Sequence, residues 1–583
     1  MRNAKIVCTL GPASSDRETI HRLAEAGMSV ARLNASHGDT EDRAALIERL
    51  RAVDEERDRP IAIMLDLQGP EIRTAPLDEG ETITLETGQT VQLAEGTAAT
   101  TDRIGVSEPL DGVSAGDRIL LDDGLIELDV IDVAGEGVET RVESGGELGS
   151  RKGVNVPGID LDLETITAGD RAELELAAEY DVDFVAASFV RDADDVYAVN
   201  EVLEGLDADV PIVSKIERAD AVDNLDELVD ASSGIMVARG DLGVELPMED
   251  VPMIQKRIIR RGHEGGVPVI TATEMLDSMV HSRRPTRAEA SDVANAVLDG
   301  TDAVMLSAET AVGDHPVRVV ETMDRIVREV ERSGEYDTVL EGRVPKSGST
   351  RTDALARAAR YLARDVGADA IVAATESGYT ARKAAKYRPA IPIVASTPHE
   401  DVRRELALSW GVTPVYAPVS NRGVDAVIER AVQSALDAGV AESGDTVVVL
   451  CGMMTELEGA NTTNMLKVHV AADTIETGRV VVEGRASGPI AHAPEGDLTD
   501  VPDGAIVAID GIDEFTGDVS KLAGIVDTRP GMTGYAALVA RELGIPMLSD
   551  ADCTTVEAGR VVTIDGDRGV VYDGDVGTDG TER

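Results

Sequence analysis

Eight short apolar runs divide the first part of the chain, and each of them ends in a polar residue. Most of them are separated by stretches whose apolar positions recur with helical spacing. The runs begin at Ala4, Met28, Ile61, Asp183, Pro211, Gly234, Val267 and Asp302. Near-continuous apolar strands that alternate with helices form parallel sheets covered on both faces. The pattern therefore predicts an α/β fold with a closed, eight-stranded β/α barrel.

The spacing changes between the third run and Thr167. Apolar residues there alternate with polar neighbours, as at Ile83, Leu85, Val91, Leu93, Ile119, Leu121, Ile126 and Leu128. Alternation predicts strands, so we expect a small β-barrel cap at residues 70–159, inserted into a barrel at residues 1–69 and 160–344. A cap in this place can close over a barrel mouth and exclude water.

Two helix starts carry the pattern of a capping box. In this motif a hydroxyl side chain and an acidic side chain three residues later satisfy each other's backbone N–H groups. The two segments are Thr286–Glu289 and Ser15–Glu18. We expect both to begin crossover helices of the barrel.

Two further patterns follow residue 344. Apolar runs at Ala370, Ile391 and Thr446, with helical stretches between them, predict a doubly wound α/β domain at residues 345–475. Another segment begins near Gly478 and ends in apolar residues after Val561. It predicts an extra C-terminal domain at residues 480–583.

Polar residues at the ends of the eight runs are the first candidates for chemistry, because barrel enzymes act at the C-terminal ends of their strands. Two cations, several carboxylates and several hydroxyls would meet at one mouth. These residues are Arg32, Asn34, Asp66, Ser188, Lys215, Glu217, Asp241, Thr273 and Ser307.

The segment Lys215-x-Glu217, followed one strand later by Asp241, is the sharpest of these signals. The two carboxylates could share one divalent cation, and a hard ion with oxygen ligands is Mg²⁺ or Mn²⁺. For either carboxylate alone, a salt-bridged rim is the better explanation. Lys215 beside both favours a function, in which the ammonium stabilises an enolate or a transferring phosphoryl group.

Composition narrows the possible partners. The chain has 109 acidic and 55 basic residues in 583, a net charge of −54, and the acids are dispersed through apolar-rich segments. A dispersed acidic surface argues against binding to nucleic acid or to anionic membranes. Only nine of the basic residues are lysines, as in proteins from a salt-loaded cytoplasm. A lysine at a strand end, such as Lys215, is therefore more informative than usual.

The three cysteines, Cys8, Cys451 and Cys553, are too far apart for metal-ligand spacing and are expected to be reduced structural thiols. No apolar run is long enough to span a bilayer, and no signal stretch precedes the first run. We expect a soluble, cytoplasmic protein.

Seven longer motifs resemble those of the pyruvate kinase family, in order, over residues 3 to about 475. They are Ala31–Gly38, Leu65–Arg73, Gly153–Gly158, Ser214–Glu217, Met236–Gly243, Ala272–Leu276 and Pro285–Glu289. The resemblance implies transfer of the phosphoryl group of phosphoenolpyruvate to ADP, which gives pyruvate and ATP in glycolysis. It also implies Mg²⁺ or Mn²⁺, K⁺ and a homotetramer.

The resemblance also assigns roles to single residues. Lys215 would stabilise the enolate, and Thr273, with Ser307 nearby, would shape the face of the enolate that takes up a proton. Since the residues offer no obvious strong general acid, we expect a water held by Thr273 and Ser307 to supply that proton. Arg32 and Arg73 would grip the phosphoryl group, and Glu217 and Asp241 would hold the divalent ion. The implied K⁺ ligands are Asn34, Ser36, Asp66 and the carbonyl of Leu67. The implied contacts to substrate or nucleotide are Arg32, Asn34, His37, Arg73, Lys152, Gly240, Asp241 and Thr273.

Two positions depart from the family pattern. Leu67-Gln68 stands where the family usually has Thr-Lys, which leaves the role of position 68 in doubt. Glu71 stands where the potassium-independent members carry lysine, so the resemblance implies a requirement for K⁺.

The segment after Ala374 aligns with the family's effector-phosphate loop, with Thr375, Ser377, Gly378 and Thr380 as candidate contacts to an anion. An ordinary strand-to-helix turn explains these residues about as well.

Gly531–Pro546 resembles the mobile phosphohistidine domain of phosphoenolpyruvate-utilising enzymes. The family's acceptor histidine falls on Tyr535. Since a phenol cannot form phosphohistidine, we expect a structural or regulatory domain.

Three other functions compete with a kinase. Lys215, Glu217 and Asp241 alone permit a lyase or aldolase that uses a metal-bound enolate. The last domain permits a dikinase or synthase with a phosphohistidine relay, which the missing histidine and the missing ATP-grasp domain disfavour. The Gln68 change permits a scaffold that lost its activity.

Overall fold

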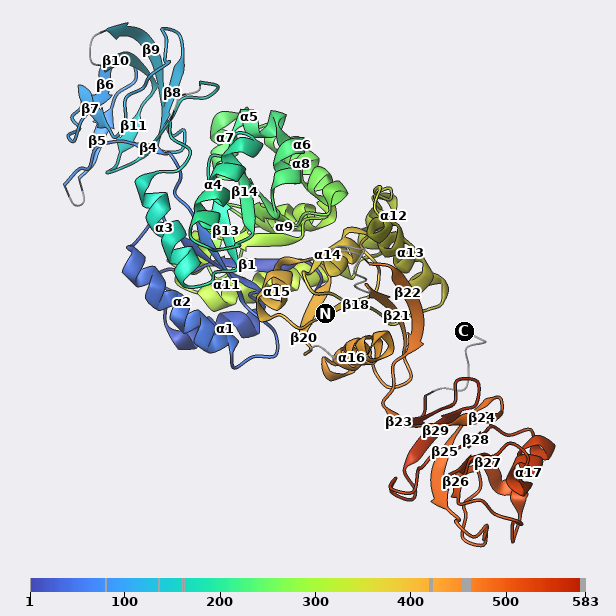
Figure 1. The fold of residues 1–583 in the computed structure, drawn as a ribbon. Coiled ribbons are helices and arrows are strands. Elements are labelled where there is room, and N and C mark those ends of the chain that lie inside the picture. Colours follow the sequence, from blue (N-terminus) through green and yellow to red (C-terminus); the bar gives the residue numbers. More distant parts are fainter. Residues whose placement is uncertain are drawn as a thin grey trace. The chain divides into compact units, whose positions relative to one another are not determined.

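The computed structural model describes residues 2–78, 81–134, 137–159, 161, 163–418, 423–452 and 463–576 (Figure 1). The expected domain limits at residues 160 and 583 therefore lie outside the described residues. The chain forms two compact units. Unit 1 comprises Met1–Ser347, Ala385–Arg388 and Glu400–Pro414, and unit 2 comprises Gly348–Ala384, Pro389–His399 and Val415–Arg583.

A closed barrel of eight parallel strands forms the centre of unit 1, which confirms the prediction from the eight apolar runs. The strand order around the barrel is β1-β17-β16-β15-β14-β13-β3-β2. Almost every strand residue is buried, as expected for strands covered on both faces. The strands are β1 (Lys5–Thr9), β2 (Val30–Asn34), β3 (Ala62–Asp66), β13 (Phe184–Ala187), β14 (Ile212–Ile216), β15 (Gly234–Ala238), β16 (Val269–Ala272) and β17 (Ala303–Leu306).

Helices surround the barrel strands (Figure 1). Long apolar side chains of these helices and the outward-facing strand residues form one large core. The helices of this unit before residue 347 are α1 (Arg17–Ala26), α2 (Thr40–Asp54), α3 (Ala168–Glu179), α4 (Ala193–Gly205), α5 (Ala219–Asp223), α6 (Leu225–Ala231), α7 (Arg239–Glu245), α8 (Val251–Gly265), α9 (Arg287–Asp299), α10 (Ala308–Ala311), α11 (Pro316–Glu331) and α12 (Gly334–Gly342). Helix α15 (Glu400–Glu405) belongs to the same unit.

One of the two expected capping boxes is present. Thr286 and Glu289 satisfy each other's backbone N–H groups at the start of α9. The other prediction was wrong: Asp16, not Ser15, precedes α1, and its carboxylate accepts the N–H of Thr19. Aspartate is as good an N-cap as serine, so the N-cap lies one residue later than predicted, and Glu18 takes no part in it.

The insertion after β3 is the expected β structure with its own core. Its main sheet has the order β4-β12-β8-β9-β10-β6-β7, and an isolated bridge between Thr74 and Val106 brings the β4 edge to the β7 edge. The sheet therefore curls toward a small barrel. Its strands are β4 (Ile72–Arg73), β6 (Thr90–Glu95), β7 (Arg103–Val106), β8 (Arg118–Leu121), β9 (Ile126–Ala134), β10 (Gly137–Ser144) and β12 (Gly153–Asn155), with β5 (Ile83–Leu85) and β11 (Gly146–Leu148) as a separate pair.

Unit 2 contains two sheets. The first has the order β20-β19-β18-β21-β22, in which β18 is parallel to β19 and β21, and β22 is antiparallel to β21. Its strands are β18 (Ala370–Ala374), β19 (Ile393–Thr397), β20 (Val412–Tyr416, which begins in unit 1), β21 (Thr446–Cys451) and β22 (Met465–Val470). The helices are α13 (Arg351–Asp365), α14 (Tyr379–Lys386, which ends in unit 1) and α16 (Val424–Asp437).

The second sheet of unit 2 has eight strands in the order β23-β30-β29-β25-β26-β27-β28-β24. They are β23 (Thr474–Thr477), β24 (Arg479–Val482), β25 (Arg485–His492), β26 (Ala505–Ile509), β27 (Leu522–Asp527), β28 (Met547–Ser549), β29 (Val561–Asp565) and β30 (Val570–Asp573), with helix α17 (Tyr535–Leu543). Among the described residues of the whole chain, no helix is long and apolar enough to cross a membrane.

Candidate functional site

Lys215 lies at the end of β14, where its ammonium meets three oxygen-bearing side chains. Its Nζ atom is 2.6 Å from the Ser188 hydroxyl and 2.8 Å from a Glu217 carboxylate oxygen. Asp66 lies 3.2 Å away on the other side. The Lys215 side chain is only 12% exposed. A largely desolvated ammonium is thus held in one position at the mouth of the barrel.

Asp66 also pairs with Arg32, so one carboxylate joins two cations. Arg32 Nε lies 2.5 Å from Asp66 Oδ2, and Arg32 Nη1 donates to the Thr9 hydroxyl at 2.9 Å. Burial alone would raise the pKa of Asp66, but Arg32 and Lys215 outweigh it and lower that pKa. Burial likewise opposes the charge on Lys215, and Asp66 and Glu217 nevertheless raise its pKa. Asp66 and Lys215 are therefore both charged at neutral pH.

Glu217 and Asp241 follow neighbouring strands, β14 and β15. Glu217 is fully buried, and its second oxygen accepts the N–H of Phe189 at 2.7 Å. Burial, opposed by Lys215 and reinforced by Asp241, raises the pKa of Glu217 to about 7. Glu217 just past the end of β14 and Asp241 in the first turn of α7 repel each other, and such a pair fits a small divalent cation. Mg²⁺ commonly uses one or two protein carboxylates and takes its other ligands from water and phosphate.

The described residues hold no cluster of three or more His, Cys, Asp or Glu side chains arranged for a metal ion. A divalent ion at Glu217 and Asp241 would therefore depend on other oxygens for the rest of its shell.

The four residues with implied K⁺ contacts lie together at the ends of β2 and β3, where Asn34 is paired in register with Asp66. Asn34 Oδ1 accepts the N–H of Ser36 at 3.1 Å, and the Leu67 carbonyl accepts the Ser188 hydroxyl at 2.7 Å. The donor set consists only of oxygens, which suits a hard monovalent cation.

Arg73 and Lys152 lie on the cap, and carboxylates of the cap hold both of them. Arg73 Nη2 and Nε lie 2.6 and 3.0 Å from one oxygen of Glu71. Lys152 Nζ lies 2.8 Å from Asp122. Sequence reasoning had left both cations free for the phosphoryl group and the nucleotide. The positive charge of Arg73 is instead largely balanced by Glu71, which lies just before the strand of Arg73.

Charges of the cap and of the barrel mouth influence each other. Burial raises the pKa of Glu71 against the opposing effect of Arg73, and Asp241 adds to the rise. Burial, then Asp241, raises the pKa of Asp123 on the cap as well. The cations act on His37. Its pKa is lowered mainly by burial and then by the positive charges of Arg73 and Arg32. The cap therefore presents both signs of charge to the site.

Thr273 forms hydrogen bonds with the start of α7 through both its hydroxyl and its carbonyl. Its hydroxyl accepts the N–H of Gly240 at 2.9 Å, and Arg239 Nη2 donates to its carbonyl at 2.6 Å. Thr273 and Glu274 have φ values of 65° and 54°, in a region that costs side chains other than glycine some strain. In the part of the chain that the structure describes, no hydrogen bond joins Ser307 to Thr273. The Ser307 N–H donates to Glu309 at 2.6 Å.

Sequence reasoning noted Ser188 only as a strand-end hydroxyl, and it missed Thr9 altogether. Both contact the cations of the site directly. A further constraint comes from Gly69, whose φ is 72° and where an added Cβ would lie 2.9 Å from that of Ser188. The polar end of β1 was the only signal for Thr9, because it follows the same rule as the other strand ends.

In unit 2, the expected effector loop runs from the end of β18 into the first turn of α14, where Thr380 lies. Gly378 has a φ of 74°, and the hydroxyl of Thr380 lies 2.7 Å from that of Thr463. Arg382 Nη2 donates to the Ser377 carbonyl at 2.8 Å. Thr375 is nearly buried. The loop thus has a guanidinium beside it, although the alternative of an ordinary turn accounts for these contacts too.

In the last segment Tyr535 is the first residue of α17, after Gly534. Its ring centroid lies 6.1 Å from that of Phe515, and the residue is 38% exposed. The phenol therefore lies partly exposed at the start of α17.

Comparison with known proteins covers nearly the whole chain. Residues 1–320 match the family model of the pyruvate kinase barrel domain, and residues 353–469 match that of the pyruvate kinase alpha/beta domain. Residues 501–569 match the mobile domain of PEP-utilising enzymes. The pyruvate kinase of Geobacillus stearothermophilus is 44% identical over 584 residues, 98% of this chain and 99% of that protein. Those of Bacillus licheniformis and Staphylococcus aureus (strain MRSA252) are 42% and 41% identical, with the same coverage.

Proposed function

Because the chain belongs to the pyruvate kinase family, we propose that it transfers the phosphoryl group of phosphoenolpyruvate to ADP in glycolysis, giving pyruvate and ATP. One observation carries the proposal beyond the family match. The Lys215 ammonium is held among Asp66, Ser188 and Glu217, beside the guanidinium of Arg32. Positive charge is thus fixed where an enolate and a phosphoryl group would both need it.

Each residue of the site then has a role. Lys215 stabilises the enolate oxygen that appears as the phosphorus–oxygen bond breaks, and Arg32 and Arg73 bind the phosphoryl oxygens. Thr273 and Ser307 hold the water that delivers the final proton. His37, Asn34, Lys152 and Gly240 complete the binding of substrate and nucleotide.

Two cations fit the site. Glu217 and Asp241 would hold Mg²⁺ or Mn²⁺, and the oxygens of Asn34, Ser36, Asp66 and Leu67 would hold K⁺. Bound there, these ions supply Lewis-acid polarisation and positive charge. The ion pair between Glu71 and Arg73 supports the K⁺ assignment, because it removes one positive charge from a site whose two substrates are anions.

The assay that tests this function measures ATP formed from phosphoenolpyruvate and ADP. Lys215→Ala should lower kcat by roughly two to three powers of ten, far more than it raises KM, by analogy with removal of an oxyanion donor. Lys256→Ala is the matched control, since Lys256 lies on α8 and pairs with Asp299. Unchanged kcat in folded Lys215→Ala would overturn the assignment. Pyruvate-dependent cleavage or condensation without ATP formation would identify a lyase or aldolase.

We further infer four domains, at residues 1–69 with 160–344, 70–159, 345–475 and 480–583. The proposed setting is a homotetramer in a salt-rich cytoplasm, with an anionic effector at Thr375, Ser377, Gly378 and Thr380. The net charge of −54 supports the salt-rich setting, since high ionic strength screens such self-repulsion.

A further inference from the structure

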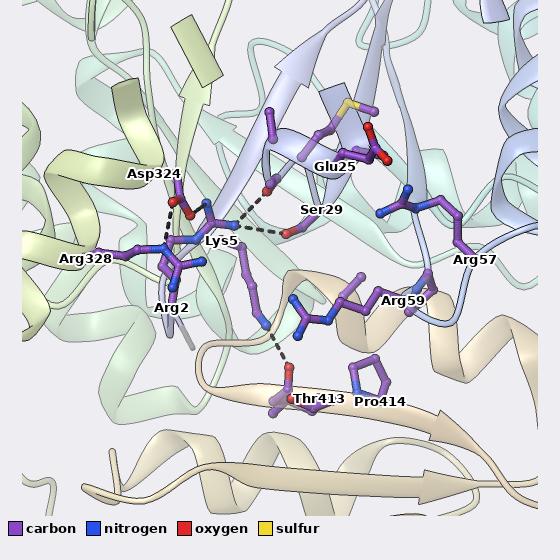
Figure 2. A pocket seen from close by; sticks show the side chains of 17 residues that line it. Arg2, Lys5, Glu25, Ser29, Arg57, Arg59, Asp324, Arg328, Thr413 and Pro414 are labelled. Carbon is purple, nitrogen blue, oxygen red and sulfur yellow. Dashed lines mark hydrogen bonds and ion pairs between the residues drawn. The ribbon is translucent and has the colours of Figure 1, made fainter. Parts of the chain in front are cut away.

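A cationic cavity lies at the start of β1, whereas Lys215 lies near the end of β14, so the two are at opposite ends of the barrel strands. Figure 2 shows the side chains that line the cavity. It has a volume of about 200 Å³ and is lined by the start of β1, the segments that precede β1, β2 and β3, part of α11 and the start of β20. Five cations line it: Arg2, Lys5, Arg57, Arg59 and Arg328. A chain with twice as many acids as bases has little reason to gather five cations around one cavity for solubility alone.

Only part of this positive charge is balanced. Asp324 lies 3.2 Å from Arg2 Nη1 and 2.6 Å from Arg328 Nε, and so serves both. The side chains of Arg57 and Arg59, in contrast, have no hydrogen-bond or ion-pair partner among the described residues, and the Nε atom of Arg57 is buried without one. The cavity therefore has guanidinium groups available for an anion.

Lys5 projects into this cavity between the guanidinium groups (Figure 2). Its Nζ atom donates to the carbonyl of Val412 at 2.7 Å, and no carboxylate of the described part of the chain forms an ion pair with it. The nearest acidic groups are engaged elsewhere, because Glu331 accepts the backbone N–H groups of Asn3 and Ala4. A buried amine among cations and without a counter-ion is more stable uncharged.

The balance of charges around Lys5 supports this conclusion. Burial, followed by Arg2 and Arg59, lowers the pKa of Lys5 to about 7, against the opposing effects of Glu331 and Asp302. Asp302 itself pairs with Arg388 at 2.9 Å. A large fraction of Lys5 is therefore a free amine at neutral pH, in contact with a cavity that attracts anions.

We propose that Lys5 is a carbamylation site, at which its uncharged amine adds to CO₂ and Arg59 and Arg57 stabilise the carbamate that forms. The nitrogen lone pair forms the new N–C bond, one C=O π pair moves to oxygen, and one proton leaves nitrogen for water. No oxidant or further reactant is needed. The remaining N–H can keep its hydrogen bond to Val412, and the new negative charge meets guanidinium groups that lack partners.

Carbamate trapping on the full-length protein tests the proposal. The protein is equilibrated with ¹³C-labelled bicarbonate and CO₂ near neutral pH, treated with triethyloxonium to convert carbamates into stable ethyl esters, and mapped by mass spectrometry. The ¹³C label is expected on Lys5. Lys256 is the internal control, because its ammonium is paired with Asp299 and should stay charged. Labelling of Lys5 no greater than that of Lys256 would overturn the proposal.

A variant tests the part played by the cations. Arg59 is exposed, so Arg59→Met should leave the fold intact, which a melting curve checks. Labelling of Lys5 should fall at least several-fold, because the carbamate loses its stabilising charge. Arg325→Met, on α11 outside this cluster of five cations, is the matched control and should keep full labelling. Equal labelling in Arg59→Met and Arg325→Met would refute the role of Arg59. The readout is mass, so it is independent of phosphoryl transfer.

Discussion

The ammonium of Lys215 and the hydroxyl of Ser188 lie 2.6 Å apart, and the same hydroxyl donates to the carbonyl of Leu67 at 2.7 Å. Ser188 thus joins the group that would stabilise the enolate to one of the oxygens that would bind K⁺. The hydroxyl is almost completely buried, so water cannot replace it without rearrangement. A change in one half of the site should reach the other through this side chain.

Ser188→Ala should therefore lower kcat by about one to two powers of ten, with little change in KM. The variant loses one hydrogen bond to a charged group, about 1.5–3 kcal/mol, while Asp66 and Glu217 still hold the ammonium. Ser214→Ala is the control, because Ser214 is equally buried on β14 but bonds to Ser232 instead. Steady-state kinetics on both variants measure the difference. If the two gave the same kcat, Ser188 would have only a structural role.

Replacement of Glu71 should change the requirement for K⁺. At constant ionic strength, activity is expected to be low in Na⁺ or tetramethylammonium and to be restored by K⁺. Glu71→Lys should reduce that dependence, because it supplies a cation and frees Arg73 from its ion pair. Glu71→Gln separates the two effects, since it frees Arg73 without adding charge. Full activity in NaCl alone, or undiminished K⁺ dependence of Glu71→Lys, would contradict the proposed K⁺ site.

His263 should make the folded protein less stable in mild acid. Burial, followed by the charge of Arg388, lowers the pKa of His263 to about 3, and its Nε2–H donates to the Lys386 carbonyl. The unfolded chain has the ordinary pKa of about 6.5 and takes up the proton first. The stabilising contribution is therefore complete above about pH 6.5 and is lost as pH falls toward 3.

The measurement compares the free energy of unfolding of the wild type and of His263→Gln, whose amide can also donate to Lys386. Between about pH 6.5 and 5 the wild type should lose about 1 kcal/mol more per pH unit. Titration of the many carboxylates is common to both proteins and cancels. Parallel pH profiles would show that His263 is protonated in the folded state.

Because Tyr535 stands in place of a histidine, the last domain is expected not to form phosphohistidine. Incubation with ³²P-labelled phosphoenolpyruvate should leave no acid-labile phosphoprotein, because a phenol stands at the start of α17. Tyr535→His restores the acceptor type and is the positive comparison. Acid-labile phosphate on the wild-type domain would show that another residue accepts it.

The apolar runs predicted the barrel well because its strands are buried on both faces, so each reads as a hydrophobic segment whose polar end marks the mouth. The cap was predictable from its alternating pattern. The ion pair of Glu71 with Arg73 could not be predicted, because the spacing of charged residues in the sequence does not show which of several carboxylates a guanidinium will contact. The cavity at Lys5 was also invisible in the sequence, since its lining comes from segments hundreds of residues apart, such as Arg2, Asp324 and Val412.

Unit 1 includes two short pieces of sequence that come after its apparent end, and buried polar contacts secure both. Arg388 pairs with Asp302, Arg404 pairs with Asp183, and the Trp410 indole donates to Tyr336. Removal of everything after residue 344 would leave Asp302 and Asp183 as buried carboxylates with fewer cations, a costly state. The barrel and the α/β sequence that follows it therefore cannot be exchanged independently between homologous proteins during evolution. Recombination between homologous genes at a junction near residue 344 would separate partners that must be inherited together.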